Sequence, residues 1–186
     1  MNRFARVVLG YHGCTSALAG DLVMGKTAID QWEPSRKSYD WLGNGIYFWE
    51  HGPRRAQEWS LSHGRDGGVV GAVIQLGRCL DLADTQFTDL LPLAYDSIRN
   101  LYAEKGWPLP KNEKGNNALD CLVINAVVVQ LGEPGFQTVR CPFLEGDKAF
   151  PDSTILRESH IQIAVIDTDC ILGVFRPNIT TQGVFL

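Results

Sequence analysis

The sequence predicts an α+β protein, in which helices interrupt a β-rich chain. Short β-branched and apolar runs that end at glycine are typical of strands, and they recur along the chain. Between them lie stretches with apolar residues at helical spacing, which begin after a capping residue or a proline. The 186 residues, 45% hydrophobic and 20% charged, suffice for one buried core, so we expect a single domain over residues 1–186.

In the first half of the chain, strands and helices alternate. A β-branched run ends at Gly10 and delivers the next residues into a turn, and Thr15 or Ser16 is placed to cap the following helix. Pro53 is typical of the first turn of a helix. The expected elements are a strand over residues 7–9, a helix over 17–23, a loop over 30–44, a strand over 45–49, a helix from Pro53 and a strand over 69–80.

The second half is expected to hold two helices and then three strands. Residues 117–131 fit a helix stopped by Gly132 and Pro134, but they are so apolar that a pair of buried strands is the alternative. The last two strands are close enough to pair antiparallel, which favours a mixed or antiparallel sheet. The other elements are a helix over 87–103, a strand over 136–143, a polar loop over 144–157 and strands over 160–166 and 171–175.

Composition and charge argue against several classes of protein. The formal net charge of −4 disfavours broad binding to nucleic acid, although a local basic groove is compatible with it. The five cysteines are scattered and form no C-x-x-C pair, so we expect reduced thiols and no metal site. The N-terminal apolar run is too short for a signal peptide, and no stretch approaches the roughly 18 apolar residues of a membrane span. We therefore expect a cytoplasmic protein without a membrane partner.

Three segments carry residues suited to chemistry. The first is YHGCT over residues 11–15, at the end of the first strand. The second is LGNGIYFW over residues 42–49, followed by Ala56 and Trp59 on a helix. The third is SHIQIAVID over residues 159–167. Any one of them occurs by chance in many chains, but their order and spacing together are more specific.

Together these segments resemble the poly(ADP-ribose) polymerase and diphtheria-toxin branch of the ADP-ribosyltransferases. That branch has a strand-end HG, a G-x-G-x-Y-F strand followed by a helix, and a late strand that carries glutamate. Some bacterial toxins and antiphage effectors of this type have glutamine at the third position, as this chain does at Gln162. The resemblance implies an ADP-ribosyltransferase-like split β-sheet core with flanking helices, and NAD as the substrate.

The resemblance assigns NAD-binding roles to four residues. His12 would hydrogen-bond with the adenosine ribose hydroxyls, and Gly13 would let the backbone approach the nicotinamide carboxamide closely. Tyr47 would stack on the nicotinamide ring, and Trp59 would complete an aromatic sandwich. Core packing is the alternative for Trp59.

The third segment supplies the candidate catalytic residues. Strand alternation places His160, Gln162 and Ala164 on one face, and Glu158 joins them if the strand begins that early. Gln162 can hydrogen-bond the nicotinamide-ribose 2′-hydroxyl, but it lacks the charge of glutamate, a loss of about 1–2 kcal/mol. Since Gln162 cannot act as a base, Glu158 or His160 would supply one if the reaction requires it.

These observations lead to one functional expectation and two alternatives. The expected function is transfer of ADP-ribose from NAD to a macromolecular acceptor, as in a toxin or defence effector. RNA, DNA and protein are candidate acceptors, with nucleic acid slightly preferred, and an antitoxin protein is a candidate partner. The alternatives are an NAD glycohydrolase and a non-catalytic protein that binds NAD or a partner.

Overall fold

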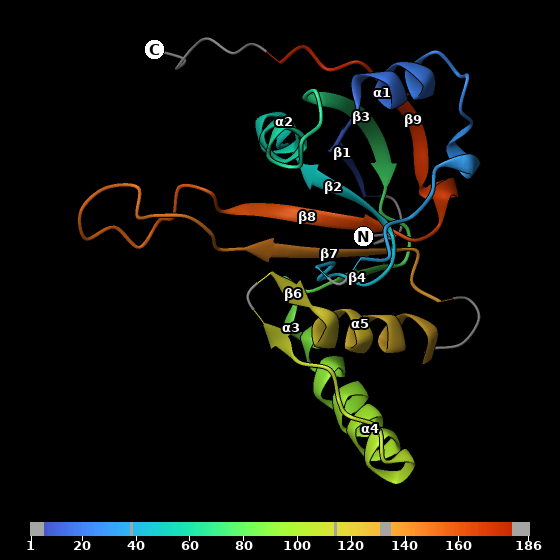
Figure 1. Ribbon diagram of the computed structural model, residues 1–186, viewed down its shortest axis with the longest axis vertical. Coiled ribbons are helices and arrows are strands. Elements are labelled where there is room, and N and C mark those ends of the chain that lie inside the picture. Colours follow the sequence, from blue (N-terminus) through green and yellow to red (C-terminus); the bar gives the residue numbers. More distant parts are fainter. Residues whose placement is uncertain (1–5, 38, 114, 131–134, 180–186) are drawn as a thin grey trace.

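The computed structural model describes residues 6–37, 39–113, 115–130 and 135–179, and it confirms an α+β fold (Figure 1). Within these residues one seven-stranded sheet has the order β4-β7-β8-β2-β1-β3-β9, in which only β4 and β7 are parallel. Its strands are β1 (Val7–Cys14), β2 (Ile46–Glu50), β3 (Gly68–Gln75), β4 (Cys79–Asp81), β7 (Thr138–Phe143), β8 (His160–Val165) and β9 (Ile171–Phe175). A separate two-stranded ribbon pairs β5 (Asn112–Glu113) with β6 (Asn116–Asn117).

Helices cover the sheet on both sides. The Thr15 side chain caps the first helix by accepting a hydrogen bond from the Leu18 backbone, and Pro53 opens the second. Figure 1 shows the fourth helix extending away from the sheet. The helices are α1 (Ser16–Val23), α2 (Pro53–Ser62), α3 (Thr85–Thr88), α4 (Leu90–Lys105) and α5 (Ala118–Gln130), with short 3-10 turns η2 (Ile29–Gln31) and η3 (Thr168–Cys170).

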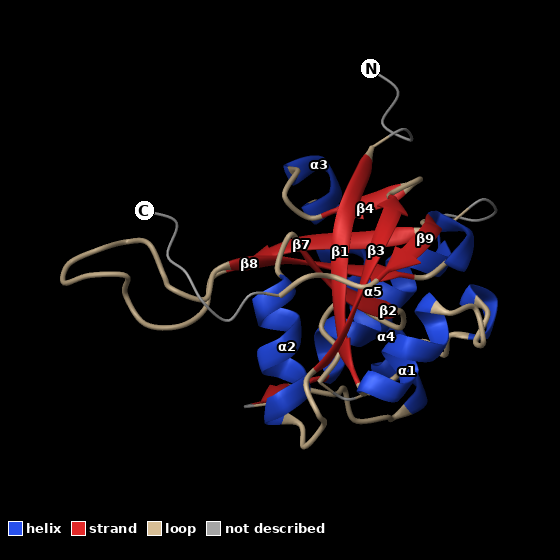
Figure 2. Ribbon diagram, turned by 90° about the horizontal axis from the view of Figure 1, so that it is seen from above, coloured by secondary structure: helices blue, strands red, loops and turns tan. Residues whose placement is uncertain are grey.

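The sheet is continuous but narrow at its middle. β1 pairs with β3 along its whole length, whereas it pairs with β2 only at Gly10 with Glu50 and Tyr11 with Trp49. Beyond this junction β7 and β8 run across the direction of β1 and β3 (Figures 1 and 2). The described strands thus form one sheet with a narrow joint, and the expected ADP-ribosyltransferase-like split core stays a prediction.

Two hydrophobic cores lie against opposite faces of β8. Ile163 and Val165 belong to the core that includes α1 residues, whereas Ala164 belongs to the core that includes α4 and α5 residues. The alternation predicted for this strand is therefore confirmed. We call the face that carries Gln162 and Ala164 the front face, and the face that carries Ile163 the back face.

The expected strand over residues 69–80 is wrong, because two strands occupy this stretch. β3 ends at Gln75, and β4 begins at Cys79 on the opposite edge of the sheet. Gly77 makes the change of direction with a φ of 56°, and a Cβ there would meet the Gln137 side chain at 2.5 Å.

The last two strands do not pair with each other, contrary to the prediction. β8 lies between β7 and β2, and β9 lies at the far edge beside β3, because η3 carries the chain past the three strands between them. β1 also continues through Cys14, so His12 lies within a strand and not in a turn.

The helical predictions need smaller changes. The helix expected over residues 87–103 is divided at Asp89 into α3 and α4. The stretch over residues 117–131 forms the single helix α5, so the alternative of two buried strands is wrong. The end of this prediction, residue 131, lies outside the described residues.

Candidate functional site

On the front face, three residues of neighbouring strands lie side by side at the centre of the sheet. Trp49 on β2 lies directly opposite Gln162 on β8, and Cys141 on β7 lies opposite Gln162 on its other side. Directly opposed residues in antiparallel strands share a face, at Cβ separations of about 5 Å. The front face at this level is thus a row of Trp49, Gln162 and Cys141.

Gln162 is buried, with 6% of its surface exposed, but only one end of its amide is paired. Its Nε2 lies 3.0 Å from Nε2 of His160, whereas its Oε1 has no hydrogen-bond partner. Trp49 Nε1 and Arg55 Nε are the other buried side-chain atoms of the described residues that lack a partner. One acceptor and two donors of this region are therefore free to bind a further polar group, as buried polar groups usually do.

His160 connects Gln162 to the loop that precedes β8. Its side chain is 5% exposed and stacks on Phe143 at a centroid distance of 5.7 Å. Its Nδ1 donates to the Glu158 carbonyl oxygen at 2.7 Å, and Oε2 of Glu145 lies 3.8 Å from the same nitrogen. A carbonyl oxygen can only accept, so Nδ1 carries the proton and Nε2 of the neutral ring is an acceptor.

Arg55, in the first turn of α2, holds both ends of this loop. Its guanidinium lies 3.3 Å from the Glu145 carboxylate and 3.6 Å from that of Glu158. It also pairs with Glu58 on its own helix at 3.2 Å. The loop between β7 and β8 projects from the body of the protein beyond these contacts (Figures 1 and 2). The Glu158 side chain is 53% exposed, so its carboxylate is accessible next to the buried His160.

Trp59 lies on α2 in an aromatic cluster beside Trp49. Its ring centroid is 5.8 Å from that of Trp49 and 5.8 Å from that of Tyr39, and the His63 ring lies 3.7 Å away. These contacts favour the core-packing role for much of its surface. Its place next to Trp49 nevertheless puts it at the same site as Gln162, and stacking on nicotinamide stays a prediction.

Tyr47 anchors the loop before its own strand. Its hydroxyl donates to the Gly43 carbonyl oxygen at 2.7 Å and accepts from the Leu42 N–H at 2.8 Å, and burial raises the pKa of this phenol. This loop carries Trp41, whose ring packs on Phe143 at 4.4 Å. The hydroxyl thus positions Trp41 near the stack on His160, while stacking of the Tyr47 ring on nicotinamide is untested.

His12 is connected to the site by a hydrogen bond to the backbone of Tyr47. Its Nδ1 donates to the Tyr47 carbonyl oxygen at 2.7 Å, and its ring meets Trp32 edge-on at 5.0 Å. Burial lowers the pKa of His12 to about 4, so the ring is neutral at pH 7 and its Nε2 can accept a hydroxyl proton. Its ring packs with Trp32 and Phe48 on the back face, so the structure does not bring His12 and Gln162 side by side.

Gly13 has a structural reason to be glycine. A Cβ at this position would overlap the Ala56 carbonyl oxygen of α2, so only glycine lets the helix pack this close to β1. The contact of Gly13 with the nicotinamide carboxamide stays a prediction.

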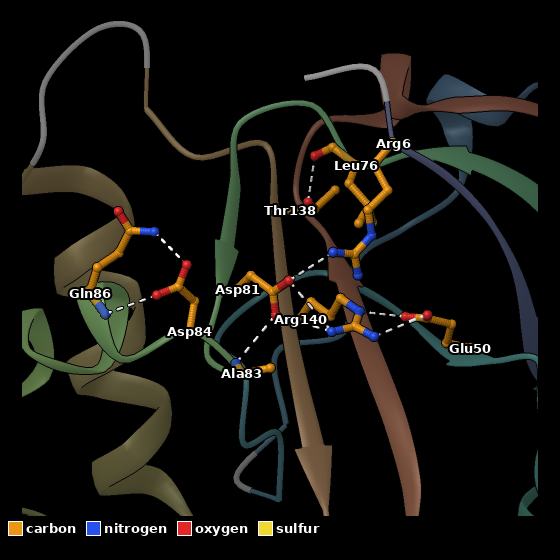
Figure 3. A network of polar contacts seen from close by, with 9 residues as sticks. All are labelled: Arg6, Glu50, Leu76, Asp81, Ala83, Asp84, Gln86, Thr138 and Arg140. Carbon is orange, nitrogen blue, oxygen red and sulfur yellow. Dashed lines mark hydrogen bonds and ion pairs between the residues drawn. The ribbon is translucent and has the colours of Figure 1, made fainter. Parts of the chain in front are cut away.

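The back face of the same strands carries a fully paired ion network (Figure 3). Arg140 on β7 donates to both carboxylate oxygens of Glu50, at 2.6 and 3.1 Å, and to Asp81 at 3.1 Å. Arg6 adds a further contact to Asp81 at 3.1 Å. Burial alone would lower the pKa of Arg140, but the hydrogen bonds and charges of Glu50 and Asp81 raise it. Arg140 therefore ties β7 to β2 across the back of β8.

Several site residues were missed by sequence reasoning. Trp49 shares a face with Tyr47 by alternation, a signal that could have marked it as a neighbour of the third segment. Phe143 and Glu145 could not have been found in this way, because only strand pairing places them beside His160. Arg55 was assigned no role in the loop, because nothing in the sequence shows which carboxylates face a helix start.

Other kinds of site are less well supported. In the part of the chain that the structure describes, no group of three or more His, Cys, Asp or Glu side chains could hold a metal ion. Within the same residues no helix is both long and apolar enough to span a membrane.

No protein-family model, curated protein or solved structure matches this chain. The side chains themselves therefore carry the functional argument.

Proposed function

We propose that this protein is an NAD-dependent ADP-ribosyltransferase that acts on a macromolecular acceptor. The observation that supports this best is the buried, unpaired Oε1 of Gln162, a residue paired in register with Trp49, whose N–H is also unpaired. Leaving such atoms without partners costs about 1–3 kcal/mol each. A sugar hydroxyl both donates and accepts, so one ribose hydroxyl could satisfy the two atoms at once.

Gln162 is also the residue that the resemblance places on the nicotinamide-ribose 2′-hydroxyl. In the proposed reaction, the bond between C1′ of this ribose and the pyridine nitrogen breaks, and its electron pair leaves with neutral nicotinamide. A lone pair of the acceptor forms the new bond at C1′, and the acceptor proton passes to a base. Glu158 is the better candidate base of the two considered, because its carboxylate is exposed whereas the His160 ring is buried.

The adenosine half of NAD is assigned to the end of β1. Neutral His12, with a protonated Nδ1 fixed by the Tyr47 carbonyl, offers Nε2 as an acceptor for a ribose hydroxyl. Gln162 lacks the negative charge that would stabilise the developing positive ribose, so the acceptor must be a good nucleophile. A nucleobase meets this requirement, and the preference for nucleic acid over protein rests on the resemblance alone.

Release of nicotinamide from NAD by the purified protein tests the proposal, with RNA, DNA and cell-extract protein present in parallel. We expect release that increases with one acceptor, and labelled ADP-ribose on that acceptor. Gln162→Ala should lower the rate by about tenfold or more, since it removes a hydrogen bond made to the reacting sugar. Gln86→Ala is the matched control, because Gln86 lies on α3 and pairs only with Asp84 in the described contacts.

The remaining outcomes separate the alternatives. Release that no acceptor increases would identify an NAD glycohydrolase. NAD binding without release would identify a non-catalytic binding protein, and no binding would contradict the proposal altogether. If Gln162→Ala, His160→Ala and wild type release nicotinamide at equal rates, the assignment of the site is wrong.

A further inference from the structure

The amide of Gln162 is held in one orientation by a chain of hydrogen bonds. The Glu158 carbonyl accepts from Nδ1 of His160, which leaves a lone pair on Nε2 of the neutral ring. The Gln162 atom 3.0 Å from that lone pair must therefore donate, and only its amide nitrogen can do so. The amide oxygen is consequently the end that has no protein partner.

We propose that His160 is a positioning residue, whose neutral ring makes Gln162 present its oxygen, and not its nitrogen, to the substrate ribose. Gln162 then offers the same kind of atom that a glutamate would offer. This inference rests on the proposed function, because the group that meets the oxygen is a hydroxyl of NAD. It also explains why His160 can be buried, since its role requires contact with Gln162 and not with the acceptor.

Protonation of His160 reverses the orientation of the amide. Both ring nitrogens of an imidazolium donate, so Gln162 must turn its oxygen toward Nε2. Its nitrogen then faces the substrate beside the N–H of Trp49, and two donors face one hydroxyl. The hydroxyl can accept from both, but its own proton loses its acceptor. A ring that donates through Nε2 would therefore weaken NAD binding.

Charged groups and a thiol surround the pair of His160 and Gln162. The Glu145 carboxylate lies 3.8 Å from Nδ1 of His160. Arg55, 3.3 Å from Glu145, partly offsets that charge and also pairs with Glu158 at 3.6 Å. On the neighbouring strand β7, Cys141 faces Gln162, and burial raises the pKa of its thiol to about 11, so the thiol is uncharged at neutral pH.

Two substitutions of His160 test the proposal through NAD affinity, measured by calorimetry. In His160→Gln, the new amide oxygen can accept from Gln162, so NAD binding should persist. In His160→Phe, which can still pack on Phe143 but cannot accept, the affinity should fall about tenfold, as for the loss of one hydrogen bond. Equal NAD affinities of the two variants would overturn the proposal.

Nuclear magnetic resonance of the protein without NAD separates this inference from the proposed function. The ring ¹⁵N shifts of His160 should report the Nδ1–H tautomer, and the side-chain amide resonances of Gln162 should move strongly in His160→Phe. An Nε2–H tautomer, or Gln162 resonances that stay unchanged in His160→Phe, would overturn the relay. An intact relay in a protein that does not bind NAD would instead contradict the proposed function alone.

Discussion

The two faces of β8 differ in how completely their polar groups are paired. On the back face, Arg140 is 9% exposed and is bonded to both Glu50 and Asp81. On the front face, Gln162 and Trp49 are equally buried, yet each keeps one polar atom without a partner. The chain can therefore satisfy buried polar groups at this level of the sheet, and the unpaired front face is the side suited to a ligand.

The largest effect is expected on the back face. Arg140→Met leaves Glu50 and Asp81 without their shared cation, and breaking such a buried pair costs about 3–5 kcal/mol. Urea unfolding measures the change. Arg99→Met is the control, because Arg99 forms an exposed pair with Asp96, and it should cost about 0.5 kcal/mol or less. Similar losses in both variants would show that the back-face network does not stabilise the fold.

A charge on the front face is expected to raise activity. Gln162→Glu restores the charge that stabilises the developing positive ribose, so nicotinamide release should become about 10- to 30-fold faster. Its free energy of unfolding should fall, because the carboxylate lies at a buried position. A charge on α3, Gln86→Glu, should leave the rate of nicotinamide release unchanged. If Gln162→Glu is slower than wild type, a negative charge at this position does not assist the reaction, which contradicts the proposed chemistry.

The smallest effect concerns the stability of the front face. Trp49→Phe removes a buried donor that has no partner, which offsets part of the packing loss, so the free energy of unfolding should stay within about 1 kcal/mol of wild type. Trp32→Phe is the control for the packing loss, because Trp32 is equally buried and lies in the back-face core. NAD affinity should fall in Trp49→Phe. Equal stability losses with unchanged affinity would show that the Trp49 N–H is not kept for a ligand.

Local patterns predicted most of the elements but not their neighbours in the sheet. The cap at Thr15, the start of α2 at Pro53 and the alternation along β8 all follow from residue type and spacing. The break at Gly77 was missed because a left-handed glycine within an apolar run resembles an ordinary strand residue. The position of β8 depends on pairing with β2, more than 100 residues earlier, and no local preference encodes it.

The sequence predicted the candidate site about as completely as it predicted the fold. The sequence placed His160 and Gln162 on one face, and the structure brings them into contact. It could not give the pairing of Arg55 with Glu145, which joins segments 90 residues apart. The partner of the Tyr47 hydroxyl and the tautomer of His160 are local, but they depend on how the loop before each strand folds. The roles of His12, Gly13 and Trp59 toward NAD stay predictions.

The place of β8 in the sheet also has a consequence for synthesis on the ribosome. β7 and β4 reach the rest of the sheet only through β8, which is made after every other strand except β9. A nascent chain that has not yet released residues 160–165 can build local helices and hairpins but not the joined sheet. It also lacks Gln162. The candidate site thus forms only when the last part of the sheet closes.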